Sequence, residues 1–189
     1  SKPQRTPADL NAIARATVGL VSHKLKMLNV ETELHLDESL PLLPCDASQV
    51  QQVVLNLVMN AAEATRPHGS GRVSVLTRRA EDGESAVLEV TDDGEGMPKE
   101  ALDRIFEPFF TTKDDGKGVG LGLAVVYGIV EAHGGRIEVR TAPGHGTTFS
   151  IYLPAAEKQV VMEKTATGTI ARGTETILQI GRASCREEC

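Results

Sequence analysis

Aromatic residues and cysteine are scarce in this sequence, and long apolar runs are absent. Trp does not occur, and aromatic residues make up only 3% of the 189 residues, so we expect a core of aliphatic side chains. No apolar run approaches the ~20 residues that a transmembrane helix needs. The N-terminal segment lacks the apolar core of a signal peptide, and we interpret it as a domain edge within a longer protein.

The cysteines and the net charge exclude further classes. Cys45, Cys185 and Cys189 have no metal-ligand spacing and form no disulfide framework, which predicts a reduced, cytoplasmic domain. The net charge is −6. Because contacts to a phosphate backbone need a surplus of Lys and Arg, we expect no nucleic-acid partner.

Hydrophobic periodicity predicts a mixture of helices and strands. An Asp at position 46 should cap the second helix, with Gln49 completing a capping box. This mixture indicates an α+β fold, a two-layer sandwich with helices on one face of a mixed sheet. The predicted helices are 9–28, 46–65, 99–105 and 121–133, and the predicted strands are 30–36, 72–77, 86–92, 137–141 and 147–153.

The second helix carries polar side chains on one face. Asn56, Asn60 and Glu63 are spaced i, i+4 and i+7, so they point the same way, away from the Val/Leu stripe. Amide and carboxylate oxygens suit Mg²⁺, with waters completing the octahedron. A solvated polar face explains the helix equally well.

Glycines gather in two further places. The strand 86–92 ends in Asp92, followed by Gly94 and Gly96, where a carboxylate can accept from an exocyclic amine such as that of adenine and the glycines let a flat ligand approach. By itself a tight acidic turn is the simpler reading. Gly118, Gly120 and Gly122 alternate before a helix, where backbone N–H groups can hold an anion. Their spacing fits neither the Rossmann nor the Walker pattern, and a flexible loop is the alternative.

Between the two glycine groups lies the segment FEPFFTTKDDGKG. Phe106, Phe109 and Phe110 can hold one end of a hinged segment, 111–119, over a nucleotide. Lys113 or Lys117 could reach a phosphate.

Taken in order, these motifs resemble the histidine kinase catalytic domain of the GHKL (Bergerat-fold) ATPase superfamily, over roughly 6–156. The resemblance implies a mainly antiparallel sheet and the cofactors ATP and Mg²⁺. The matching boxes are the N box (Asn56, Asn60), a first glycine box (Asp92, Gly94, Gly96), an F box (Phe106, Pro108, Phe109), a second glycine box (Gly118, Gly120, Gly122) and a final glycine box (Gly144, Gly146, Thr148).

The resemblance also implies roles for single residues. Asn60 resembles the Mg²⁺ ligand, and Asn56 replaces the general-base glutamate of related ATPases, which suits a kinase that keeps ATP until a histidine attacks. Asp92 resembles the residue that binds the adenine amine. Lys113 joins Asn56 and Asn60 as a catalytic candidate. The implied ATP-binding residues are Asn56, Asn60, Glu63, Ala64, Asp92, Gly94, Gly96, Met97, Phe109, Thr111, Thr112, Lys113, Lys117, Gly118, Val119, Gly120, Leu121, Gly122, Leu123 and Thr148.

The sequence departs from the family pattern at two points. Many relatives have a basic residue where Glu63 stands, so a phosphate contact at this position is in doubt. The presence of Glu63 here resembles the nitrogen-regulator-like subgroup. His23 is not the phosphoacceptor, because it lies only 37 residues before Asn60 and is followed by Lys24 instead of an acidic residue. We therefore expect the acceptor histidine to lie outside this chain.

The resemblance predicts a domain order and partners. Residues 1–6 would end a linker from a dimerisation domain, 7–156 form the catalytic domain, and 157–172 form a second linker. Residues 173–178 resemble the start of a receiver domain, and 179–189 resemble a non-native tail. The expected partners are a histidine-bearing dimerisation domain and a response-regulator receiver domain, fused C-terminally in a hybrid parent, which would be a homodimer and could be membrane-anchored.

Two other functions stay open on sequence grounds. One is an ATPase of the same fold, as in gyrase B, mismatch-repair or heat-shock proteins. The other is a non-catalytic nucleotide-sensing module.

Overall fold

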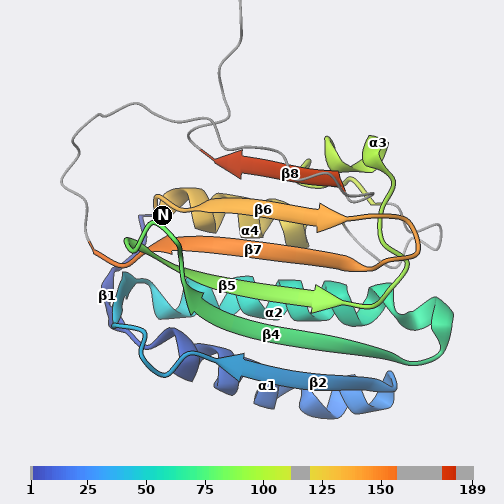
Figure 1. The fold of residues 1–189 in the computed structure, drawn as a ribbon, viewed down its shortest axis with the longest axis horizontal. Coiled ribbons are helices and arrows are strands. Elements are labelled where there is room, and N and C mark those ends of the chain that lie inside the picture. The colour runs from blue at the N-terminus through green and yellow to red at the C-terminus, as the bar shows by residue number, and fades with distance from the viewer. Residues whose placement is uncertain (1, 112–119, 157–175, 182–189) are drawn as a thin grey trace, which may run out of the picture.

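A six-stranded sheet forms one layer of the molecule (Figure 1). The computed structural model describes residues 2–111, 120–156 and 176–181. The strand order is β2-β4-β5-β7-β6-β8; β2 and β4 are parallel, and the other neighbours are antiparallel. The strands are β2 (Val30–Leu36), β4 (Gly71–Arg79), β5 (Ser85–Asp92), β6 (Arg136–Thr141), β7 (Thr147–Pro154) and β8 (Thr176–Gly181).

Three long helices form the second layer and lie behind the sheet in Figure 1. They are α1 (Leu10–Met27), α2 (Ala47–Ala64) and α4 (Gly122–Ala132). This arrangement confirms the predicted α+β sandwich with helices on one face of a mixed, mainly antiparallel sheet. Short helices α3 (Lys99–Leu102) and η1 (Arg66–His68) lie in the connections. In the described parts of the chain, no helix has both the length and the apolar character needed to cross a membrane.

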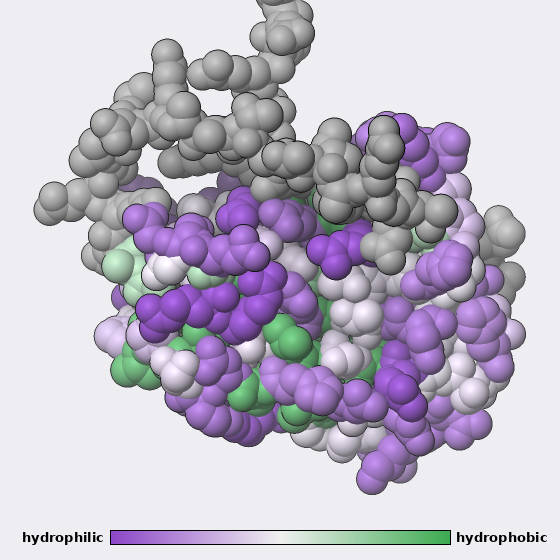
Figure 2. Space-filling model, in the orientation of Figure 1, coloured by the Kyte–Doolittle hydropathy of each residue, from purple (hydrophilic) through white to green (hydrophobic). Residues whose placement is uncertain are grey.

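The core between the layers is aliphatic, as the scarcity of aromatic residues predicted. Alternate residues of β5, including Leu88 and Val90, point toward the helices and are buried, and Val54 and Val58 of α2 meet them from the other layer. The opposite face of the sheet is mainly hydrophilic (Figure 2). It carries the Arg78–Glu89 ion pair, at 2.7 Å, between neighbouring strands.

The N-cap predicted at Asp46 forms, but the capping box predicted with it does not. The Asp46 carboxylate accepts from the backbone nitrogen of Gln49, at 3.2 Å. In a capping box, the Gln49 side chain would in turn accept the backbone N–H of Asp46. That N–H instead donates to Nε2 of His133, at 3.0 Å and 87 residues away. A tertiary contact has therefore replaced the local one.

The reading of the sequence needs correction at two further points. The alternation of apolar and polar residues over 30–36 predicts a half-buried strand, but in β2 only Val30 is buried and Leu34 is 40% exposed, because β2 is the edge strand of the sheet. Two short strands escaped prediction. They are β1 (Thr6–Ala8) and β3 (Leu43–Cys45), which pair antiparallel as a separate small sheet.

Strand β8 lies antiparallel to β6 at the other edge of the sheet. Its Leu178 packs partly buried against the main core. The strand spans the proposed boundary between the 173–178 and 179–189 segments, and the domain division remains a prediction.

Candidate nucleotide-binding site

The N box and the second glycine box meet where α2 passes the start of α4. The side-chain nitrogen of Asn56 donates to the backbone oxygen of Gly122, at 3.3 Å and 66 residues away. A Cβ atom on Gly122 would lie 3.8 Å from the amide nitrogen of Asn60. Both asparagines are half-buried, so they border the start of α4 rather than a freely solvated surface.

The first glycine box packs on the last turn of α2. The backbone nitrogen of Gly94 donates to Oδ1 of Asp92, at 2.9 Å, and the backbone nitrogen of Glu95 donates to the oxygen of Ala64, at 3.3 Å. Glu63 and Ala64 are half-buried beside this contact. The N box and the first glycine box are thus joined through the C-terminal end of one helix.

Asp92 is a buried carboxyl group, with 6% of the residue exposed. Burial raises its pKa to about 6; hydrogen bonds from the backbone of Gly94 and of Thr147 act in the opposite direction, and the charge of Asp93 adds to the rise. A carboxylate that is held at the end of a core strand despite this cost is typical of functional sites. Its chemistry suits an exocyclic amine donor.

The final glycine box lies directly against the first. Gly96 and Gly146 both have positive φ, at 67° and 70°, and a Cβ on either would collide with backbone of the other loop or its neighbour. Thr141 joins the loops, because its Oγ1 accepts from the backbone nitrogen of Met97 at 3.0 Å and donates to the oxygen of Gly146 at 2.9 Å. Sequence reasoning missed Thr141, whose only signal is a hydroxyl at a buried strand position.

The structure separates Thr148 from Asp92. The backbone of Thr147 contacts the Asp92 carboxyl group, and Thr147 faces Asp92 in the β5–β7 pairing. Thr148 pairs instead with Thr91, with 3.0 Å between the two hydroxyl oxygens, on the other side of the sheet. Thr147, and not Thr148, therefore contacts the Asp92 carboxyl group, and the nucleotide contact expected of Thr148 stays a prediction.

The F box touches the second glycine box through backbone. The backbone nitrogen of Phe109 donates to the oxygen of Gly120, at 3.0 Å, and Gly120 has a φ of 68° with Phe109 and Phe110 backbone atoms where a Cβ would lie. Phe106 packs on Tyr127 of α4, with ring centroids 5.8 Å apart.

Several expected site residues do not converge or cannot be placed. Phe109 itself is 72% exposed and has a positive φ of 66°. Leu121 is the N-cap residue of α4 and 39% exposed, whereas Leu123 is half-buried against the core. Thr111 is exposed. The expected residues Thr112, Lys113, Lys117, Gly118 and Val119 lie outside the described residues.

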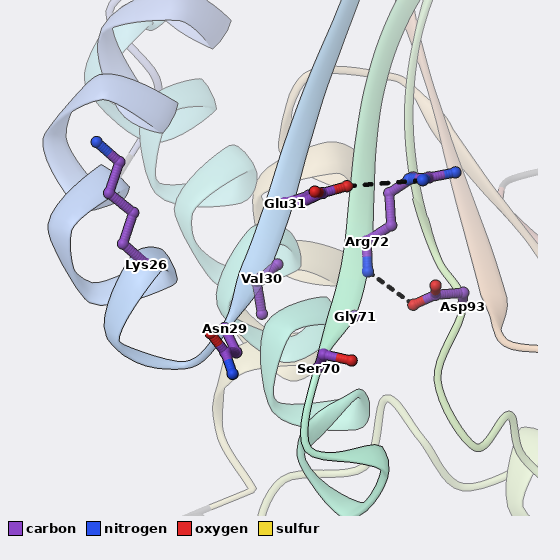
Figure 3. A pocket seen from close by; sticks show the side chains of 8 residues that line it. All are labelled: Lys26, Asn29, Val30, Glu31, Ser70, Gly71, Arg72 and Asp93. Carbon is purple, nitrogen blue, oxygen red and sulfur yellow. Dashed lines mark hydrogen bonds and ion pairs between the residues drawn. The ribbon is translucent and has the colours of Figure 1, made fainter.

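A hollow of ≈ 540 Å³ opens at another part of the same sheet end (Figure 3). Of the box region it includes only Asp93, whose carboxylate accepts from the backbone nitrogen of Arg72 at 2.8 Å. Asn60, Asp92 and Gly120 line neither this hollow nor a smaller one at the final glycine box, within the described residues. The roles implied for the boxes require one cavity that joins Asn60, Asp92 and Gly120, and that cavity stays a prediction. The residues lining the hollow are Lys26, Asn29, Val30, Glu31, Ser70, Gly71, Arg72 and Asp93.

The donors on α2 fit a hard cation in kind. Asn60 offers an amide oxygen, and oxygen ligands from one or two side chains are what Mg²⁺ takes from a protein when phosphates and waters supply the rest. In the part of the chain that the structure describes, no three His, Cys, Asp or Glu side chains gather as a metal-binding group.

Comparison with known proteins identifies the family. Residues 45–157 match the family described as "Histidine kinase-, DNA gyrase B-, and HSP90-like ATPase". The sensor histidine kinase ZraS of Escherichia coli (strain K12) is 40% identical over 146 residues, which cover 77% of this chain and 30% of that protein. This chain thus spans about a third of such relatives.

Solved structures agree. The catalytic domain of the histidine kinase ThkA has a TM-score of 0.70 and 31% identity, over 80% of this chain and 95% of that one. Full-length ShkA in complex with AMPPNP has a TM-score of 0.71 and 30% identity, over 82% and 32%. ThkA in complex with the response regulator protein TrrA gives 0.67 and 27%, over 82% and 42%.

The matching family model covers more than half of the chain, and the ThkA catalytic domain is covered almost completely. The chain therefore belongs to the histidine kinase-, DNA gyrase B- and HSP90-like ATPase family. Within that family its similarity is to the catalytic domains of sensor histidine kinases, which confirms the resemblance drawn from the boxes.

Proposed function

We propose that this chain binds Mg-ATP and presents its γ-phosphate to a histidine of a separate dimerisation domain in two-component signalling. The observation that supports it most is the convergence on α2. Asn56 reaches Gly122 near the middle of the helix, and Ala64 holds the loop of Asp92 and Gly94 at its end. One helix thereby connects the predicted phosphate and adenine ends of a nucleotide site.

The chemistry of each end follows from its groups. At the adenine end, the ionised carboxylate of Asp92 accepts from the exocyclic amine. At the phosphate end, the backbone N–H groups at the start of α4 face negative charge. Bound Mg²⁺, held in part by Asn60, would neutralise phosphate oxygens, so that catalysis rests on positioning and electrostatics.

The phosphoryl transfer needs no reactant other than ATP and the acceptor histidine. An imidazole nitrogen of the acceptor histidine attacks the γ-phosphorus, the bond to the bridging oxygen of the β-phosphate breaks, and ADP leaves while the ring proton passes to solvent. Asn56 carries an amide where a hydrolytic relative would carry a carboxylate base. An amide cannot take a proton from water, so ATP is kept for the histidine.

The experiment uses radiolabelled ATP, this chain and a dimerisation domain from a ZraS-type kinase. We expect label on that domain, in acid-labile form, and none when its histidine is replaced. Steady hydrolysis of ATP by the chain alone would favour an ATPase of the same fold instead. Nucleotide binding without transfer to any dimerisation domain would favour a sensing module.

We further propose that the parent passes the phosphate to a receiver domain and works as a homodimer in the cytoplasm. The ThkA–TrrA complex, a related kinase with a response regulator, supports the first part.

A further inference from the structure

Helices α2 and α4 run antiparallel and are tied together at two levels. One tie is the hydrogen bond from Asn56 to Gly122, at the proposed nucleotide site. The other is the hydrogen bond from the backbone of Asp46 to His133. Ten residues separate Asp46 from Asn56 and eleven separate Gly122 from His133, about 15 Å along each helix. The two ties therefore fix how far one helix can slide along the other.

The hydrogen bond between Asp46 and His133, which lies farther from the proposed nucleotide site, depends on a buried, neutral histidine. His133 is 3% exposed and is the C-cap residue of α4. Its Nδ1 lies 2.8 Å from the oxygen of Ile129 and its Nε2 lies 3.0 Å from the backbone nitrogen of Asp46. Since a carbonyl only accepts and an amide only donates, the ring proton must be on Nδ1. The ring thus connects the end of one site helix to the start of the other.

The N-terminal segment binds both sides of this tie. The backbone nitrogen of Gln4 donates to Oδ2 of Asp46, at 3.0 Å, and Nη2 of Arg5 donates to the oxygen of Ala132, at 2.7 Å. The next three residues, β1, pair with β3, which ends one residue before Asp46. The chain that enters the domain is therefore bonded to the N-cap of α2 and to the last turn of α4.

We propose that Gln4–Ala8 and His133 form a coupling junction that sets the position of α4 against α2, and through it the affinity for nucleotide. The proposal rests on the proposed function, because it places the nucleotide at the opposite ends of these helices. When the entering segment is bonded, α2 and α4 are held in one register and the Asn56–Gly122 contact forms. When the segment is pulled away, the register is released and the nucleotide binds less tightly. His133 is a positioning residue in this device.

Two matched pairs of variants test the junction in the full 189-residue chain. Gln4→Pro removes the N–H that Asp46 accepts, whereas Gln4→Ala keeps it. Arg5→Ala removes the bond to Ala132, whereas Arg15→Ala removes an exposed arginine of α1 that pairs with Glu38, away from the junction. By calorimetry with Mg-ADP, we expect Gln4→Pro and Arg5→Ala to weaken binding roughly fivefold or more, and the controls to change it less than twofold.

A second measurement distinguishes a junction that is coupled to nucleotide binding from one that only stabilises the fold. Coupling is reciprocal, so Mg-ADP should slow hydrogen exchange at the Asp46 amide by the same factor by which the variants weaken binding. The proposal is overturned if Gln4→Pro and Arg5→Ala bind Mg-ADP as tightly as the wild-type chain does. It is also overturned if the rate of hydrogen exchange at the Asp46 amide is the same with and without Mg-ADP. In either case the junction is only structural. If the wild-type chain does not bind Mg-ADP at all, the proposed function fails and takes this inference with it.

Discussion

A Cβ atom on Gly94 would lie 2.5 Å from the carbonyl oxygen of Ala64, at the end of α2, and 2.8 Å from Oδ1 of Asp92. The loop after β5 can therefore approach the helix only because residue 94 has no side chain. The same close approach lets the nitrogen of Glu95 donate to the oxygen of Ala64. The arrangement links the stability of the loop to the shape of the proposed adenine site.

Gly94→Ala should therefore destabilise the fold by about 1–3 kcal/mol, because backbone atoms cannot yield as a side chain would. Urea unfolding measures the change. Gly128→Ala is the matched control, since a Cβ there meets nothing within 4 Å on α4, and alanine in a helix should stabilise by about 0.5–1 kcal/mol. Equal stability of the two variants would contradict the tight packing at Gly94.

Asp92→Asn should make the protein more stable at pH 8. The pKa of Asp92 is about 6 when folded and 3.8 ordinarily, so the folded state holds the proton more tightly than the unfolded chain. Stability therefore falls as pH rises from about 4 to about 6 and stays at the lower level above that, by up to about 3 kcal/mol. An asparagine pays no such cost, and its amide oxygen can still accept from Gly94.

Urea unfolding at pH 4 and pH 8 tests this. The gain in Asp92→Asn should be about 1–3 kcal/mol at pH 8 and small at pH 4. Asp93→Asn, on the exposed neighbour, should change stability by less than half as much. A wild-type stability that does not depend on pH between 4 and 6 would argue against a buried carboxyl group with a raised pKa.

The same Asp92→Asn variant should bind adenine nucleotides much more weakly, although it is more stable. It removes the carboxylate that accepts the exocyclic amine, and the nitrogen that replaces one oxygen is a donor facing a donor. Calorimetry with ADP and with GDP should show the wild-type preference for ADP shrink in the variant. Unchanged ADP affinity would remove the adenine assignment while leaving the fold intact.

The features that the sequence predicted are those that depend on near neighbours. The predicted strand 30–36 has the bounds of β2, and the capping role of Asp46 is found, because alternation and capping act over a few residues. Features that depend on distant partners were missed. Nothing near Asp46 indicates that its N–H goes to His133, and the three-residue strands β1 and β3 are too short to show a period.

In the candidate site, too, features set by near neighbours were predicted and features set by distant partners were missed. The boxes were found because glycine, asparagine and aspartate at fixed spacing are visible in the sequence. Their contacts were not, since the residue of β7 that pairs with Asp92, Thr147, is set by the register of the sheet. Thr141 escaped for a similar reason, because its two hydrogen bonds go to loops that only the fold brings together.

A chain ending at residue 156 should still fold and bind Mg-ADP. The sheet keeps its other five strands, and the one β8 side chain whose burial the structure describes, Leu178, is only partly buried against the core. We expect a loss of about 1–2 kcal/mol in urea unfolding and a nucleotide affinity within twofold of the full chain. Failure of this shorter chain to unfold cooperatively would show that β8 belongs to the catalytic domain and that the predicted boundary at 156 is wrong.

Substitutions at Asn60 and at Asn56 should differ in how they change the Mg²⁺ dependence of ATP binding. Asn60 is proposed to hold Mg²⁺, so Asn60→Ala should weaken ATP binding in the presence of Mg²⁺ and leave ATP binding in excess EDTA nearly unchanged. Asn56→Ala loses the hydrogen bond to Gly122. It should therefore weaken ATP binding under both conditions and lower the free energy of unfolding by about 1 kcal/mol. Calorimetry under the two conditions gives the ratio of affinities with and without metal. That ratio should collapse toward one only in Asn60→Ala, and phosphotransfer should fall with it. Asn60→Asp keeps an oxygen ligand but adds a charge, so it should retain part of the metal dependence and still transfer phosphate poorly. An unchanged ratio in Asn60→Ala would mean that another oxygen of the site holds the metal, and the role of the N box would then be confined to the packing of α4.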